Sequence, residues 1–345
     1  FANYYHINDD KLDFTIELMQ EYLIYITKPD GTIPMVGDST AWNVIDKLRL
    51  SGIEISNEHL LYLVSDGLEG KEISQNSIVY QDAGVAVFKN DWKKVDPIYF
   101  ALFNGFHSTV HKHGDDLSFV LTYQQTDYFV DSGKYNYDGD DPYRVFARSV
   151  FAHNSIAVDD KDYDVGNADN IGKSIIEKYV ITSNYSYVKG SHTLFDGVKI
   201  TRSVIFFNDG AIYFHDNIES NDSHTYTQIF NVGKDVHIDD TDTNNVSLSS
   251  MIDNSSLNLT QLIEVSEYQS YTGSNDPIRG WQSTSFNQVS PITTLHFQQE
   301  GKDISFKTVI NIGLHIIDVD YFQEESKDIF VFTFENGRTE RIEII

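Results

Sequence analysis

From about residue 71 onward the chain is a succession of short runs with strand-like alternation, and this pattern restricts its fold more than any other feature. The clearest runs are 77–88, 98–103, 117–123, 128–131, 198–207, 211–216 and 329–334. Asn208-Asp209-Gly210 and Asn336-Gly337 separate alternating segments and are typical of hairpin turns. Many short strands with few helices predict a large antiparallel β-sandwich over residues 71–345.

The first 70 residues have a different, helical pattern. Apolar residues recur at three- and four-residue spacings from 11 to 26, before Pro29-Asp30-Gly31 ends the helix. Shorter helical patterns follow at 40–50 and 57–65. Three helices alone bury little core, so we expect residues 1–70 to be a helical segment that packs on something else.

Composition excludes several classes of protein. Hydrophobic residues make up 40% of the chain and aromatics 13%, as in a folded protein rather than a disordered one. With 25 basic against 52 acidic residues, the formal charge of −27 disfavours nucleic acid and anionic membrane as partners. No apolar run reaches the roughly 18–20 residues of a membrane span. Cysteine is absent, which excludes disulfides and thiolate chemistry. The chain begins at Phe1 without a leader, so we expect a fragment or a processed chain.

Histidines cluster in one stretch. His107, His111, His113 and His153 lie within 47 residues of sequence. If His111-Lys112-His113 is a strand, both imidazoles share one face, whereas in a loop that inference is lost. Two histidines and a carboxylate such as Asp131 are a ligand set that zinc accepts. An H-x-H pair is also common as ordinary surface or core histidines, and His107 is expected to be a loop residue.

Several segments in a fixed order are more specific than any one motif. They are HKHGDDLSF at 111–119, FVDSG at 129–133, YRVFARS at 143–149 and AHNS at 152–155, with PDGTIP at 29–34, GDS at 37–39 and GWQS at 280–283. Together they closely resemble the heparinase II/III-like polysaccharide lyases, from about residue 29 to about residue 305.

This resemblance implies an architecture and a reaction. Such lyases have an (α/α) toroid followed by a β-sandwich domain, with the substrate cleft between the two, and they cleave uronic-acid-containing polysaccharides by β-elimination. Residues 1–70 would then be the end of the toroid and 71–345 the β-sandwich domain. The principal catalytic tyrosine of the family comes from the middle of the toroid, so we expect this chain to need an N-terminal toroid domain and to be inactive alone.

The resemblance also implies residue roles. His113, Asp131 and His153 match the ligands of a structural metal, most plausibly zinc. His111 matches the cleft histidine, and Tyr143 matches a second cleft tyrosine, although Tyr135 and Tyr137 lie nearby.

The reaction makes further demands on the cleft. Tyr and His can exchange protons near neutral pH, and a donor near the uronate carboxylate stabilises the enolate-like intermediate. Lys112, Arg144 and Arg148 are candidates to bind substrate anions, unless neighbouring aspartates pair with them. Asn231 stands where many relatives are expected to have histidine.

Charge and substrate class lead to two further expectations. So acidic a chain favours a uronate polymer that is less charged than densely sulfated heparin, such as an alginate, a lightly sulfated glycosaminoglycan or a bacterial exopolysaccharide. A polymer of this kind implies a periplasmic or extracellular location.

Two other functions remain open. One is a non-catalytic carbohydrate-binding or scaffolding β-sandwich, in which Trp281 or Tyr163 stacks on sugars. The other is a glycoside hydrolase using Asp115 and Asp116, which is disfavoured because adjacent residues on a strand face opposite ways.

Overall fold

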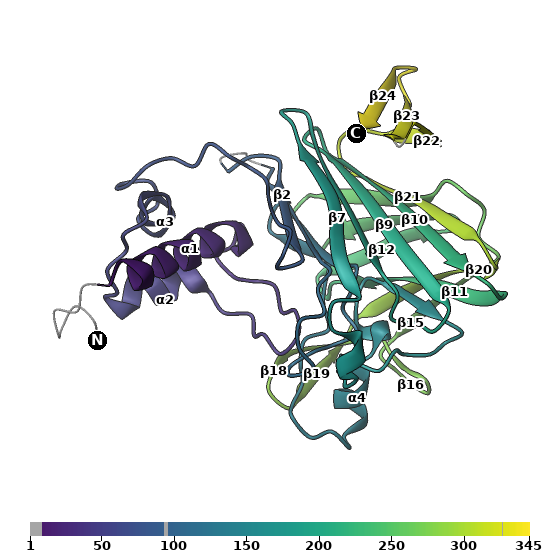
Figure 1. The fold of residues 1–345 in the computed structure, drawn as a ribbon, viewed down its shortest axis with the longest axis horizontal. Coiled ribbons are helices and arrows are strands. Elements are labelled where there is room, and N and C mark those ends of the chain that lie inside the picture. Colours follow the sequence, from purple (N-terminus) through teal and green to yellow (C-terminus); the bar gives the residue numbers. More distant parts are fainter. Residues whose placement is uncertain (1–8, 93–95, 326) are drawn as a thin grey trace.

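Three helices lie to one side of a large β structure (Figure 1). The computed structural model describes residues 9–92, 96–325 and 327–345. The helices are α1 (Asp10–Ile26), α2 (Val44–Ser51) and α3 (Glu58–Val64), which confirms the predicted helical patterns. Side chains of Asp9, Asn43 and Asn57 cap their N-termini by accepting backbone N–H groups. None of the described helices is long and apolar enough to cross a membrane.

Two antiparallel sheets make up the β-sandwich, which confirms the predicted fold class. The first sheet runs in the order β1 (Ile78–Tyr80), β2 (Val85–Lys89), β3 (Ile98–Phe103), β4 (Ser118–Tyr123), β5 (Thr126–Phe129), β11 (His224–Val232), β20 (Thr293–Gly301) and β15 (Glu267–Thr272), with β6 (Ile156–Val158) paired to β11. The second runs in the order β12 (Val236–Thr241), β13 (Asn245–Ser250), β14 (Ser256–Gln261), β21 (Ile304–Asn311), β10 (Ala211–Ser220), β9 (Val198–Phe207), β8 (Tyr185–His192) and β7 (Ser174–Ile181).

Shorter elements decorate the sandwich. They are α4 (Pro142–Arg148), the 3₁₀ turns η1 (Val150–Ala152) and η2 (Ala168–Asn170), the hairpins β16 (Ser274–Asn275)–β17 (Ile278–Arg279) and β18 (Trp281–Ser285)–β19 (Gln288–Pro291), and a third sheet of β22 (Ile316–Glu324), β23 (Lys327–Phe334) and β24 (Thr339–Ile344). In Figure 1, α4, β18 and β19 lie at the bottom of the view and the third sheet at the top.

Strand boundaries follow the turn residues. The hairpins predicted at Asn208-Asp209-Gly210 and Asn336-Gly337 join β9 to β10 and β23 to β24. The run at 77–88 is two strands rather than one. Its break falls at Gly84, which has a φ of 72° and packs so closely on Asn104 that a side chain there would meet backbone.

Buried apolar layers on both faces of the second sheet hold the β structure together. Aromatic rings fill the space between the two sheets, with Phe119 lying 5.5 Å from Phe100 and 4.8 Å from Phe214 between ring centroids. The third sheet covers the outer face of the second sheet, where Phe332 packs on Phe207 and Tyr213. The prediction of a single β-sandwich over residues 71–345 did not include this extra layer.

The helical segment packs on the outer face of the first sheet. Residues of α1 and α3 share a buried apolar cluster with Val87, Tyr99 and Ala101 of β2 and β3. The buried Lys89 amine donates to the Thr27 carbonyl at 2.9 Å, just beyond the end of α1. These contacts bring the segment after α1, which contains Asp38, against the loop that follows β3.

Candidate active site

The histidine pair at 111 and 113 lies in a loop between β3 and β4, not on a strand. His111 has a φ of 60°, so the alternation that would place both imidazoles on one face does not apply. The two rings nevertheless meet at one carboxylate. Nδ1 of His111 lies 2.6 Å from Asp38 Oδ2, and Nε2 of His113 lies 3.0 Å from Asp38 Oδ1.

Asp38 is the centre of this group and was not among the predicted site residues. Besides the two histidines, it accepts a hydrogen bond from Arg144 Nη1 at 2.7 Å. Burial alone would raise the pKa of Asp38, but hydrogen bonds from His113, Arg144 and His111 lower it far below its ordinary value. Asp38 is therefore an ionised anchor that joins the segment after α1 to the β domain.

His111 is the exposed member of the group. Its side chain is 64% exposed, whereas that of Asp38 is 7% exposed. Because an ionised carboxylate can only accept, Nδ1 of His111 carries the hydrogen of their bond, and in the neutral imidazole Nε2 is left with a lone pair. The arrangement presents one oriented imidazole that is able to exchange a proton with a bound molecule.

His113 and His153 form a buried pair beneath this group. Both are fully buried, and their ring centroids lie 5.6 Å apart. His153 Nδ1 lies 2.7 Å from Asp131 Oδ2, while Asp131 Oδ1 accepts the Gly133 N–H at 2.8 Å. Nδ1 of His113 and Nε2 of His153 have no hydrogen-bond partner.

The tautomers of this pair follow from their partners. His113 Nε2 lies closer to Asp38 than to Arg144 Nη1, which is 3.2 Å away, so Nε2–H donates to the carboxylate and Nδ1 keeps a lone pair. His153 donates from Nδ1 to Asp131 and, in its neutral form, keeps its lone pair on Nε2. The structure therefore holds two buried, unpaired imidazole lone pairs on adjacent rings.

Charge around the pair is balanced by the same carboxylates. Burial lowers the pKa of His113 below its ordinary value. Burial acts in the same direction on His153, but the Asp131 carboxylate raises the pKa of that ring overall.

A zinc-type site fits these residues in part. Unpaired nitrogens of two neighbouring imidazoles are ligands that zinc accepts. The carboxylate of Asp131, however, is bound to the opposite nitrogen of His153, an arrangement typical of a group that orients a metal-binding histidine. Over the described ranges, no group of three or more His, Cys, Asp or Glu side chains is positioned to hold a metal ion.

Tyr143 lies among aromatic side chains next to the histidine group. Its hydroxyl donates to Asn275 Oδ1 at 3.0 Å, and its ring contacts Tyr135 and Trp281 at centroid distances of 5.7 and 5.5 Å. Tyr137, rather than Tyr143, contacts His111, at 6.3 Å between ring centroids. Tyr137 is thus the tyrosine in contact with His111, whereas Tyr143 is bonded to Asn275 of β16.

Lys112 faces inward rather than toward a surface. The residue is only 8% exposed, and its amine forms ion pairs with Asp115 and Asp116. Both carboxylates are buried, so they are not presented as the acid and base of a glycoside hydrolase. Tyr163 is also buried and donates to Asp116 Oδ2 at 2.6 Å, which is contrary to the idea that its ring stacks on sugars.

The two predicted arginines border one recess along α4. A recess of about 190 Å³ is lined by Arg144 and Arg148 together with Asp162 and Asp164. Arg144 is buried and bound to Asp38, whereas Arg148 is partly exposed and donates weakly to the Lys112 carbonyl at 3.4 Å. Of the two, Arg148 is freer to meet an incoming anion.

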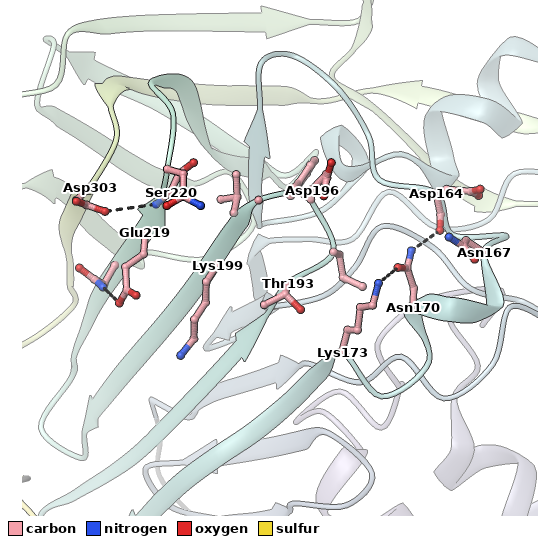
Figure 2. A pocket seen from close by; sticks show the side chains of 16 residues that line it. Asp164, Asn167, Asn170, Lys173, Thr193, Asp196, Lys199, Glu219, Ser220 and Asp303 are labelled. Carbon is pink, nitrogen blue, oxygen red and sulfur yellow. Dashed lines mark hydrogen bonds between the residues drawn. The ribbon is translucent and has the colours of Figure 1, made fainter.

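Two further features have no assigned role in the site: a polar recess away from the histidines, and the buried side chain of Asn231. A polar recess of about 1070 Å³ is bordered by Lys173, Lys199 and Glu219, and the Lys173 amine donates to the Asn170 side chain at its edge (Figure 2). The side chain of Asn231 is fully buried and neither of its amide atoms has a partner, for which the structure offers no explanation.

More than half of the chain matches known proteins in sequence. The family model "Heparinase II/III-like, C-terminal" matches residues 73–315. A curated heparin-sulfate lyase of Bacteroides stercoris is 25% identical over 211 residues, which are 59% of this chain and 31% of that protein. One from Pedobacter heparinus is 25% identical over 203 residues, 56% of this chain and 29% of the relative.

Solved structures agree on the fold. A heparinase III structure superposes with a TM-score of 0.83 at 19% identity, covering 97% of this chain and 52% of the other. The heparan sulfate lyase HepC of Pedobacter heparinus gives 0.80 at 19% identity, covering 97% and 53%. The chain thus spans about a third of the curated relatives' length and about half of these structures. Because the family model covers well over half of its residues, the chain belongs to the heparinase II/III-like family through the C-terminal domain of that family.

Proposed function

We propose that this chain is the C-terminal part of a polysaccharide lyase that cleaves a uronic-acid-containing polysaccharide by β-elimination. The observation that carries the proposal is the exposed His111 imidazole, oriented by a buried carboxylate that also holds Arg144. An N-terminal toroid domain would supply the other wall of the cleft and the remaining catalytic groups. Family membership makes the reaction class the natural assignment.

The proposed roles follow from the steps of the reaction. A base removes the proton from the carbon next to the uronate carboxylate, the bond to the glycosidic oxygen on the neighbouring carbon breaks, and a double bond forms between the two carbons. A proton must then reach the departing oxygen. His111 Nε2 suits proton transfer or, when protonated, donation to the carboxylate. Tyr143 is proposed as a second proton-transfer group, and Arg148 as a contact for substrate anions.

We further propose a structural divalent metal, zinc, beneath the cleft. His113 Nδ1 and His153 Nε2 are its proposed nitrogen ligands, and Asp131, the carboxylate of the predicted set, would orient His153 through its bond to Nδ1. A bound ion would stabilise the local structure. The protein's own contribution is positional, because His113 binds Asp38 through its other nitrogen and Asp38 in turn binds His111. Fixing His113 would thereby help to orient the exposed imidazole.

The substrate is proposed to be an anionic polysaccharide met in the periplasm or outside the cell. The curated relatives are heparin-sulfate lyases, and this supports a heparan-type glycosaminoglycan as one candidate. The net charge of −27 favours a polymer of lower charge density, such as a lightly sulfated glycosaminoglycan or an alginate.

Ultraviolet absorbance tests the reaction class, because β-elimination creates an unsaturated sugar end that absorbs. The full-length product of the gene, assayed on heparan sulfate, alginate and unsulfated glycosaminoglycans, is expected to generate this chromophore from at least one polymer. His111→Ala is expected to lower the rate at least about 100-fold. His107→Ala is the matched control, since His107 is exposed on the same loop but bonds the Ala83 carbonyl instead of Asp38.

Three results would contradict the proposal. New reducing ends without the chromophore would indicate hydrolysis. Binding of a polysaccharide without cleavage would favour a non-catalytic carbohydrate-binding β-sandwich. Equal loss of rate in His107→Ala and His111→Ala would remove His111 from its assigned role.

A further inference from the structure

Two large aromatic side chains are exposed beside the candidate active site. Tyr137 and Phe286 are each 56% exposed, and their ring centroids lie 6.2 Å apart with 45° between the ring planes. Tyr137 belongs to the segment between β5 and α4, and Phe286 to the turn between β18 and β19. Exposed apolar rings in mutual contact are costly to leave in water, so their placement calls for a reason.

Backbone contacts hold together the two segments that carry these rings. The Asn287 N–H donates to the Tyr135 carbonyl at 3.0 Å, and the Ser283 N–H donates to the Ser132 carbonyl at 2.8 Å. Gly133, with a φ of 74°, packs so closely on Ser283 that an added Cβ would lie 2.3 Å from its carbonyl oxygen. The β18–β19 hairpin is therefore tied to the 132–137 segment, and the rings need little ordering when a ligand arrives.

Positive and proton-donating groups surround the Tyr137 ring. The Arg144 guanidinium lies 5.6 Å from the ring centroid and the Lys134 amine 5.2 Å. Lys134 also donates to the Tyr137 hydroxyl at 3.4 Å. The His111 ring approaches at 6.3 Å. A ligand lying on these rings would thus have its polar edge near the Lys134 amine, with the Arg144 guanidinium, held by Asp38, behind the Tyr137 ring.

We infer that Tyr137 and Phe286 form a stacking platform for one pyranose ring of an anionic polysaccharide, next to the sugar that reaches His111. A pyranose ring offers an apolar face of C–H groups and a polar rim, which matches an exposed aromatic face bordered by an amine and a guanidinium. This inference deepens the proposed function and rests on it for the choice of an anionic sugar chain. It makes Tyr137 and Phe286 binding residues, distinct from the proton-transfer groups.

Oligosaccharide titration of this chain tests the platform. The ligands are size-fractionated heparan sulfate and alginate oligosaccharides, and uncharged cellohexaose, with binding followed by calorimetry. Tyr137→Leu and Phe286→Leu are each expected to weaken anionic oligosaccharide binding about five- to tenfold. Tyr179→Leu is the matched control, because Tyr179 is also exposed, at 43%, but lies on β7. Thermal unfolding of each variant separates lost binding from lost fold.

The outcomes for the platform and for the lyase proposal are distinct. Weaker binding in both platform variants, with Tyr179→Leu unchanged, supports the platform. A second outcome is that both variants weaken binding of cellohexaose as strongly as binding of the charged ligands, and that the charged ligands bind no better than cellohexaose. In that case the platform is supported and the uronate lyase proposal fails. Unchanged binding in both platform variants, with His111→Ala weakened, overturns the platform and leaves the lyase proposal intact. No binding of any ligand, or binding that none of these variants changes, overturns the platform.

Discussion

Two buried clusters of charged and polar side chains in this protein differ in how fully their hydrogen-bonding groups are paired. In the sandwich core, Arg202 and Asp216 are both fully buried and form a bidentate ion pair with distances of 2.7 Å. The remaining Arg202 nitrogen donates to the carbonyls of Leu117 and Asn154 at 2.7 and 2.8 Å, and Gln228 donates to Asp216. Each nitrogen of the guanidinium thus has an acceptor.

The histidine cluster lacks that completeness. Asp38, Asp131 and Arg144 are bonded on several sides, yet His113 Nδ1 and His153 Nε2 have no partner. A buried polar atom without a partner costs free energy, so it persists where something else compensates. The comparison teaches that the completed network serves the fold, whereas the incomplete one is suited to take up a ligand.

Removing one charge from the core network should have the largest effect. Arg202→Met keeps most of the side-chain volume but strands the Asp216 carboxylate in the core. We expect a loss of about 3–5 kcal/mol in the free energy of unfolding, measured by urea denaturation. Arg202→Met combined with Asp216→Asn should recover part of it. A loss below about 1 kcal/mol would show that the completed network does not support the fold.

Substitution of Lys112 tests whether this residue, next to the site, stabilises the fold or binds substrate. Lys112→Met leaves the buried Asp115 and Asp116 without their cation, and we expect a loss of about 3 kcal/mol in the free energy of unfolding. Arg148→Met, at a partly exposed arginine of the same region, should cost less than about 1 kcal/mol. Should Lys112→Met retain full stability but lose oligosaccharide binding, the substrate role predicted from the sequence would hold instead.

A buried histidine outside both clusters sharpens the comparison through pH. Burial lowers the pKa of His215 to about 4, at a site where its ring lies 4.4 Å from that of Tyr321 on the third sheet. The unfolded chain, with an ordinary histidine pKa near 6.5, then binds the proton first as pH falls. Stability from this group is present above about pH 6.5 and is lost on acidification toward pH 4.

The matching variant is His215→Leu, compared by denaturation at pH 7 and pH 4. We expect the free energy of unfolding of this variant to fall by about 3 kcal/mol less between pH 7 and pH 4 than that of the unchanged protein. His107→Leu, at an exposed histidine, should leave the pH dependence as it was. Identical pH dependence in all three proteins would mean that His215 accepts a proton in the folded state without cost.

Much of the fold could be predicted from the sequence because its signals are local. The alternation at 98–103 and 198–207 matches β3 and β9 residue for residue, and the hairpin turns lie where Gly210 and Gly337 adopt positive φ. The third sheet could not be separated from the sandwich. Its alternating strands look like any others, and only tertiary packing on Phe207 and Tyr213 places them in a layer of their own.

The site was harder to predict from the sequence, because tertiary packing assembles it from segments that are far apart in the chain. Asp38 is 73 residues from His111, and only the packing of the helical segment on the first sheet brings them together. The one local signal was the family-like Gly37-Asp38-Ser39 segment, which resemblance had placed in the helical region. The left-handed backbone at His111 also breaks the two-residue periodicity from which a shared face was inferred.

The most direct test of the account is the metal content of the purified chain. We expect about one zinc-like ion per chain after incubation with zinc, and its loss in His113→Ala and in His153→Ala. His296→Ala is the control, because His296 is also buried with an unpaired Nε2 but is surrounded by Phe151 and Tyr271 rather than by a second histidine. That variant should keep the ion. No bound metal in any of these proteins, or equal loss in His296→Ala, would contradict the claim that the incomplete cluster is a ligand site.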